Sequence, residues 1–204
     1  MKAKFFSILA LGSAVSNAAI TITTIVDPDV DFNARAIEIY VTGTVDLGNY
    51  DLQRAANSSP FDETFNLPAG TFTDQFVYLV NDDAAFDTVF GAGVGPTIVL
   101  GAITGNGNDA FRIVDDGTNN VIDVVGEGGS SIYLDSFMSR NSGTSADTTW
   151  NAANWNIPGN NTLDGLTEAE TAAAVPFGTF VAIPEPSTTL LGGLALLGLL
   201  RRRR

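Results

Sequence analysis

The chain of 204 residues contains neither cysteine nor histidine. Without cysteine it can form no disulfide, no thiolate nucleophile and no cysteine-ligated zinc site. Without histidine it lacks the usual general base near neutral pH and the commonest protein ligand of transition metals. These absences exclude the most frequent nucleophilic and zinc-dependent catalytic sites, and they favour a protein that is not an enzyme.

Basic residues are also scarce, and most of them lie at the two ends of the chain. Lys2 and Lys4 lie at the start, and four arginines form the C-terminus. Residues 19–183 contain four arginines against 22 acidic residues, a net charge of −18. Nucleic-acid binding depends on cationic side chains that displace counterions from phosphates. We therefore expect no nucleic-acid partner, and we attribute the acidic excess to solubility outside the cell.

No stretch between residues 19 and 166 has a sustained apolar period of 3.6 residues. Short β-branched or alternating runs are separated instead by Gly, Asn, Asp and Pro clusters, and residues 116–120 carry a strong hairpin signal. This pattern predicts an all-β fold, an antiparallel sandwich over residues 19–166. The predicted strands cover residues 20–26, 36–41, 75–80, 110–114, 121–125 and 131–139. The expected core residues are Ile37, Ile39, Val77, Leu79, Ile113, Val121, Val124, Phe137 and Trp155, with Tyr50 and Leu52 also facing inward.

The N-terminal segment has the composition of a secretory signal peptide. Lys2 and Lys4 precede an apolar run over residues 5–15, and small residues lie at the two positions that a signal peptidase inspects. We expect residues 1–18 to be the signal peptide, with cleavage after Ala18. At the other end of the domain, residues 167–182 are rich in Ala, Thr and Gly and are predicted to be a linker or a loosely packed last segment of the domain.

The C-terminal residues 183–204 combine three features in order. These are the motif Pro184, Glu185 and Pro186, a Leu/Gly-rich run over residues 190–200, and the terminal Arg201, Arg202, Arg203 and Arg204. A hydrophobic helix over residues 188–200 would be about 20 Å long, shorter than the hydrocarbon core of about 30 Å. It can engage a membrane but is a marginal permanent anchor. The arginines would keep the C-terminus on the cytoplasmic side and leave the β domain outside.

This tail closely resembles the PEP-CTERM sorting signal of Gram-negative bacteria that make extracellular polysaccharide. The resemblance implies recognition of Pro184, Glu185 and Pro186 by exosortase, a membrane-embedded processing enzyme. It also implies that the hydrophobic run and the arginines stop translocation until processing, as a removable hydrophobic tail does in other anchor signals. A simple single-pass anchor is the alternative.

The domain itself resembles a lamin tail domain. Several segments occur in the order found in that family: AIEIY at 36–40, VDLGNYDLQR at 45–54, GNGNDAF at 105–111, VIDVVG at 121–126, FMSR at 137–140, and LDGL at 163–166 after Trp155. The resemblance implies an immunoglobulin-like β-sandwich with no activity of its own. Asn108 stands where the family usually has Asp, which weakens the carry-over of a metal-binding role for that turn.

Acidic residues early in the chain have the spacing of a calcium loop. Asp27, Asp29, Asp31 and Glu38 occupy the first, third, fifth and twelfth positions, but Phe32 replaces the required glycine and Glu38 falls in a predicted strand. The EF-hand interpretation therefore fails. A looser Ca²⁺ site made by Asp27, Asp29 and Asp31 remains open beside a solvated acidic turn, and no other cofactor is expected.

Two further patterns bear on catalysis and sugar binding. The adjacent pairs Asp82–Asp83 and Asp115–Asp116 are more typical of turns than of the two facing carboxylates of a glycosidase. Trp150 and Trp155 are candidates for a sugar-binding face, although Trp155 is also expected in the core.

Together these observations favour a non-enzymatic structural or interaction module, exported through the inner membrane to the cell surface or the extracellular polysaccharide matrix. Its expected partners are signal peptidase, an exosortase-like enzyme, the membrane through the tail, and extracellular polysaccharide. The alternative is a calcium- or carbohydrate-binding adhesion module.

Overall fold

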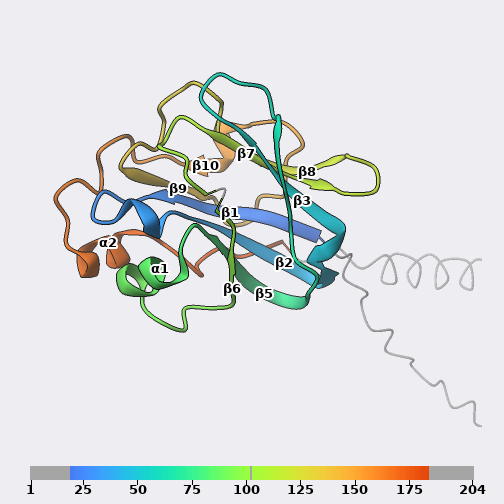
Figure 1. Ribbon diagram of the computed structural model, residues 1–204, viewed down its shortest axis with the longest axis horizontal. Helices are drawn as coiled ribbons and strands as arrows, with labels where there is room; N and C mark the ends of the chain where they lie inside the picture. The colour runs from blue at the N-terminus through green and yellow to red at the C-terminus, as the bar shows by residue number, and fades with distance from the viewer. Residues whose placement is uncertain (1–18, 102, 184–204) are drawn as a thin grey trace, which may run out of the picture. The chain divides into compact units, whose positions relative to one another are not determined.

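The computed structural model describes residues 19–101 and 103–183, which form two β-sheets that pack against each other (Figure 1). In the six-stranded sheet the strand order is β10-β9-β1-β2-β5-β6, and in the four-stranded sheet it is β4-β3-β7-β8. All paired strands are antiparallel except β5 and β6. The strands are β1 (Ala19–Asp27), β2 (Ala36–Asp46), β3 (Tyr50–Ala55), β4 (Glu63–Asn66), β5 (Thr71–Val80), β6 (Thr97–Val99), β7 (Ala110–Asp115), β8 (Val121–Val125), β9 (Ser136–Arg140) and β10 (Trp155–Asn156).

Five short helical segments complete the domain. Two are α-helices, α1 (Asp83–Phe90) and α2 (Glu168–Ala174), and three are single 3₁₀ turns, η1 (Phe32–Ala34), η2 (Leu47–Asn49) and η3 (Ala152–Asn154). The two-sheet architecture confirms the predicted all-β class, and the turn at residues 116–120 joins β7 to β8 as the hairpin signal indicated. Helix α1 was not predicted, although Asp82 as N-cap and Phe86, Val89 and Phe90 at helical spacing are its sequence signals.

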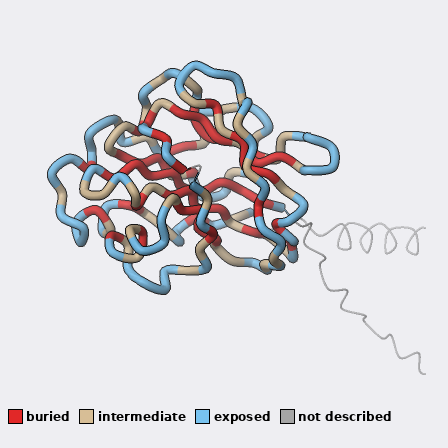
Figure 2. Tube along the Cα trace, viewed as in Figure 1, coloured by how far each residue is buried: buried red, intermediate tan, exposed pale blue. Residues whose placement is uncertain are grey.

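The main hydrophobic core lies between the two sheets. Ile37 and Ile39 of β2 and Val77 and Leu79 of β5 contribute from the six-stranded sheet, and Ile113 of β7 contributes from the four-stranded sheet. Eight of the nine predicted core residues are buried, and Val121 is half-buried. Buried residues follow the strands of both sheets (Figure 2).

A second core covers the other face of the six-stranded sheet. Tyr78 and Val80 of β5 pack there with Phe86 of α1 and with Leu163 and Val175 from the C-terminal part of the domain. Strands β1 and β2 are therefore buried on both faces, which explains why their apolar residues are not confined to alternate positions.

Residues 167–182 do not form the predicted linker, because this segment contains a helix and packs in the second core. Residues 168–174 form α2, which begins with a capping box in which the Thr167 hydroxyl and the Glu170 carboxylate each accept a backbone N–H. Val175 and Phe180 are buried, and Phe177 packs with Phe86 and Tyr78. This alanine- and threonine-rich segment forms a helix because Val175 and Phe177, which follow it, pack in the second core and keep the segment against the sheet.

The predicted signal peptide with its cleavage position Ala18 lies outside the described residues. So do residues 184–204 of the sorting tail, where the sequence predicts a short hydrophobic helix. Neither α1 nor α2, the α-helices in residues 19–101 and 103–183, could span a bilayer.

Candidate functional site

The structure separates the three aspartates that the sequence grouped as a calcium loop. Asp27 is fully buried at the end of β1, where its Oδ1 atom accepts a hydrogen bond from Arg35 Nε at 2.5 Å. Asp31 caps η1, because its Oδ1 atom accepts from Asn33 N at 2.9 Å. Of these three aspartates, only Asp29 is exposed. The prediction that Asp27, Asp29 and Asp31 form one site is therefore corrected: two of the three stabilise local structure.

Asp29 instead lies beside two acidic residues that are distant in sequence. Carboxylate oxygens of Asp29, Asp135 and Asp164 all lie within 4.8 Å of one another. They come from the loop after β1, the residue before β9 and the loop before α2. Burial, followed by the nearby carboxylates of Asp164 and Asp29, raises the pKa of Asp135. Three oxygens gathered in this way can bind a hard cation. Spacing alone could not reveal this group, because its members meet only in the folded chain.

The outer face of the four-stranded sheet carries a pocket with a volume of about 340 Å³. Ala110 and Arg112 of β7 and Val124 of β8 form part of its lining. Phe61, from the loop before β4, and Trp150, from the loop before β10, supply aromatic walls. Its polar contributors besides Arg112 are Glu127, Thr148 and Thr149, all of which are exposed.

Trp150 and Trp155 have different roles in the structure. Trp155 is buried in the main core, with 6% of its surface exposed. Trp150 packs beside it, with the ring centroids 5.8 Å apart, and is half-buried at the wall of the pocket. The two tryptophans therefore do not form a common sugar-binding face: Trp150 lines this pocket, and Trp155 lies in the core.

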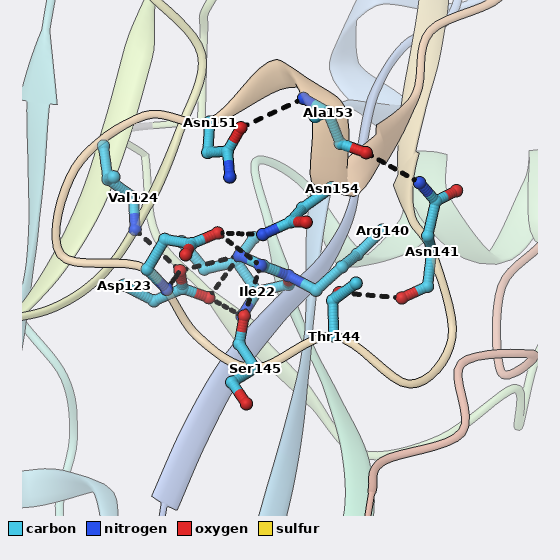
Figure 3. Close-up of polar contacts among 11 residues, drawn as sticks. Ile22, Asp123, Val124, Arg140, Asn141, Thr144, Ser145, Asn151, Ala153 and Asn154 are labelled. Carbon is cyan, nitrogen blue, oxygen red and sulfur yellow. Dashed lines mark hydrogen bonds and ion pairs between the residues drawn. The ribbon is translucent and has the colours of Figure 1, made fainter.

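A buried ion pair lies behind the loop that carries Trp150. Arg140 Nη2 of β9 donates to both carboxylate oxygens of Asp123 of β8 at 2.7 Å, and both side chains are fully buried (Figure 3). Ile22 of β1 joins the pair: its N–H donates to Asp123 Oδ2 at 2.7 Å, and its carbonyl accepts from Arg140 Nε at 2.6 Å. Because β8 belongs to one sheet and β1 and β9 to the other, the pair connects the two layers.

The same pair organises the loop between β9 and β10. Asp147 N donates to Asp123 Oδ1 at 2.8 Å, and the Ser145 carbonyl accepts from Arg140 Nη1 at 2.8 Å. The guanidinium also lies over the ring of Trp155, 4.7 Å from its centroid. Burial raises the pKa of Asp123 to about 6, against the lowering effect of Arg140 and the backbone donors, so its carboxylate remains charged at neutral pH.

Glu38 of β2 is a second buried acid, and it holds the C-terminal segment of the domain on the sheet. Its carboxylate accepts hydrogen bonds from the Thr23 and Thr24 hydroxyls at 2.7 and 3.2 Å and from Gly178 N at 2.5 Å. Among the described residues it has no cationic partner. Burial therefore raises its pKa, although these donors and Tyr78 act in the opposite direction.

The adjacent acid pairs stabilise local turns. Asp82 caps α1 by accepting from Ala85 N at 2.9 Å, and Asp83 accepts from the Thr97 hydroxyl at 2.5 Å. In the β7–β8 turn, Asp115 accepts from both the N–H and the hydroxyl of Thr118. This is the turn-forming role that adjacent acids usually have.

Comparison with known families identifies one feature of the chain, at its C-terminus. Residues 182–204 match the PEP-CTERM protein-sorting motif. The match confirms the sorting tail inferred from the sequence, and it implies processing by exosortase and membrane association during sorting. It thereby supports export and sorting to the cell surface. Comparison with curated proteins finds no match to this chain.

Proposed function

We propose that this chain is a non-enzymatic interaction module that exosortase-dependent sorting delivers to the surface or the polysaccharide matrix of a Gram-negative bacterium. The PEP-CTERM match over residues 182–204 carries this proposal. The tail follows directly on a β domain with its own two cores, so its processing would release or attach a complete folded unit.

Each part of the two termini has a role in this proposal. Residues 1–18 direct export and are removed after Ala18 by signal peptidase. Pro184, Glu185 and Pro186 are recognised by the exosortase-like enzyme. The arginines at 201–204 stop translocation, because they favour the cytoplasmic side of the membrane.

We further propose that the domain is an immunoglobulin-like, lamin-tail-like sandwich. Support comes from the order of its structural features. Strand β2 leads through η2 into β3 over the segment that resembles the family's opening motif, and the β7–β8 hairpin follows the resembling turn at residues 105–111. A domain of this kind supplies a binding surface and no chemistry of its own.

The sorting proposal is tested by localisation of the full chain in its producing cell. Replacing Pro184, Glu185 and Pro186 together by alanine is expected to leave the uncleaved chain in the inner-membrane fraction. Pro68→Ala, which changes an exposed proline of the folded domain, serves as the control and is expected to reach the surface. Surface delivery of the triple variant in normal amount would overturn the proposal.

Calcium-dependent adhesion is a second candidate function. The observation that favours it is the approach of Asp29, Asp135 and Asp164. A divalent cation there would relieve the repulsion among the three carboxylates and would join three loops of the domain.

A further inference from the structure

We propose that the pocket on the outer face of the four-stranded sheet binds a neutral pyranose unit of a polysaccharide. The proposal rests on the proposed function to the extent that it names a ligand for the exported module. The pocket volume of about 340 Å³ lies near the lower end of the range of roughly 300–1,000 Å³ that is typical of small-molecule sites. The pocket therefore suits one or two sugar rings.

Arg112 is held in place, and its terminal N–H groups remain available as hydrogen-bond donors. Its Nε atom donates to Gln53 Oε1 at 2.7 Å, and its guanidinium carbon lies 4.4 Å from the centroid of the Phe61 ring. Gln53 is itself positioned by a bond from its Nε2 atom to Asn119 at 3.3 Å. In the described part of the chain, the terminal nitrogens of Arg112 have no acceptor and are not fully buried. A fixed guanidinium with free N–H groups is suited to donate to two neighbouring hydroxyls.

The remaining contributors complement the two kinds of surface on a sugar ring. A pyranose has an apolar C–H face, which stacks on aromatic side chains, and a rim of hydroxyls. Trp150 provides a large flat apolar surface with little conformational freedom to lose. Glu127 accepts hydrogen bonds, while Thr148 and Thr149 both donate and accept them.

The charges favour a neutral sugar over a uronate or a purely apolar ligand. Arg112 and Glu127 balance each other at the pocket, and the domain around them has a net charge of −18 from four arginines and 22 acidic residues. An acidic polysaccharide would be repelled by this negative charge along its whole length. A purely apolar ligand would leave the free donors of Arg112 without acceptors, which is costly.

Tryptophan fluorescence measures this binding directly, because the chain has only two tryptophans and Trp155 is buried. The full chain, in a detergent without a sugar headgroup, is titrated with cellohexaose, laminarihexaose and, for comparison, hexagalacturonate. We expect a saturable change in emission with at least one neutral hexaose and a weaker response to hexagalacturonate. Arg112→Met should weaken binding by about tenfold or more, and Trp150→Leu, which removes the fluorescent reporter and is therefore followed by titration calorimetry, should weaken it to a similar extent.

Two additional variants keep the test independent of folding and of sorting. Glu127→Gln changes an exposed side chain and should lower affinity without altering the melting temperature, while Phe90→Leu, in the second core, should not lower affinity. The proposal is overturned if neither neutral hexaose binds, if hexagalacturonate binds more tightly than both, or if Arg112→Met leaves affinity unchanged in folded protein. None of these results bears on the tail, whose role is measured by localisation.

Discussion

Arg140 and Asp123 lie on strands of opposite sheets and form a fully buried ion pair with Nη2–O distances of 2.7 Å. Asp123 also accepts hydrogen bonds from the backbone N–H groups of Ile22 in β1 and of Asp147 in the loop before β10. It therefore determines both how the layers meet and how the loop carrying Trp150 is held.

Removing one member of this pair should be strongly destabilising. Arg140→Met leaves the Asp123 carboxylate buried without its cation, and breaking such a pair costs about 3–5 kcal/mol. Urea unfolding followed by circular dichroism measures the loss. Glu63→Gln, which removes a partly exposed partner of Arg54, is the comparison and should cost about 1 kcal/mol or less. Equal losses in the two variants would contradict the role assigned to the buried pair.

Stability should fall as the pH rises from about 4.5 to 7.5. Burial raises the pKa of Glu38 above its unfolded value and that of Asp123 from 3.8 to about 6. At a pH between the pKa of the unfolded state and the higher pKa of the folded state, the folded protein binds more protons than the unfolded protein does. The free energy of unfolding therefore decreases as the pH rises. For Asp123 the decrease is on the order of 3 kcal/mol at most. The lowered pKa values of Asp46 and Glu170 act in the opposite direction, but both groups are exposed.

Glu38→Gln separates the contribution of that residue. Thermal unfolding across this pH range should show a shallower decrease in the variant, because glutamine does not titrate. Glu168→Gln, at an exposed helical position, should keep the wild-type slope. A slope that is zero or rises with pH in the wild type would show that burial of these acids does not control its pH response.

Gly107 should tolerate no side chain. Its φ is +83°, and a Cβ atom there would lie 2.2 Å from the N and Cα atoms of Leu134. Gly107→Ala should therefore cost about 1–3 kcal/mol or more in urea unfolding. Gly117→Ala is the matched control, because its Cβ would meet only Asp115 Oδ1 at 3.6 Å and its φ is not positive. A fully stable Gly107→Ala would contradict the described packing of this turn.

Calcium should raise the melting temperature if the second candidate function is right. Calorimetric titration with CaCl₂ is expected to show saturable binding that Asp135→Asn weakens, because one of three carboxylate charges is lost. Asp62→Asn, at an exposed position that is not part of this cluster, should bind as the wild type does. Absence of both heat and a melting shift would remove the calcium proposal.

Local patterns predicted the longer strands better than they predicted long-range encounters, but β4, β6 and β10 were not predicted, and the strand expected over residues 131–139 begins only at Ser136. The alternation in residues 36–41 and the Asp116–Gly117 turn depend on neighbours in sequence, so strand β2 and the β7–β8 hairpin were foreseeable. Helix α2 was missed although Thr167 and Glu170 have the spacing of a capping box, because alanine and threonine also suit a linker.

The candidate sites lay beyond sequence reasoning for a different reason. Asp29 and Asp164 are brought together by the packing of loops, and no short-range pattern encodes that approach. Trp150 was singled out, but its neighbours Phe61 and Arg112 come from other elements, so its pocket appears only in the folded chain. The sorting tail is the opposite case, because its motif is contiguous and was identified from residues 183–204 alone.

The mature C-terminus, determined by intact mass of protein released from the cell surface, tests the central claim most directly. We expect a mass that lacks both residues 1–18 and the hydrophobic run with its terminal arginines. Surface protein that still carries residues 190–204 would contradict exosortase processing and would indicate a retained anchor instead.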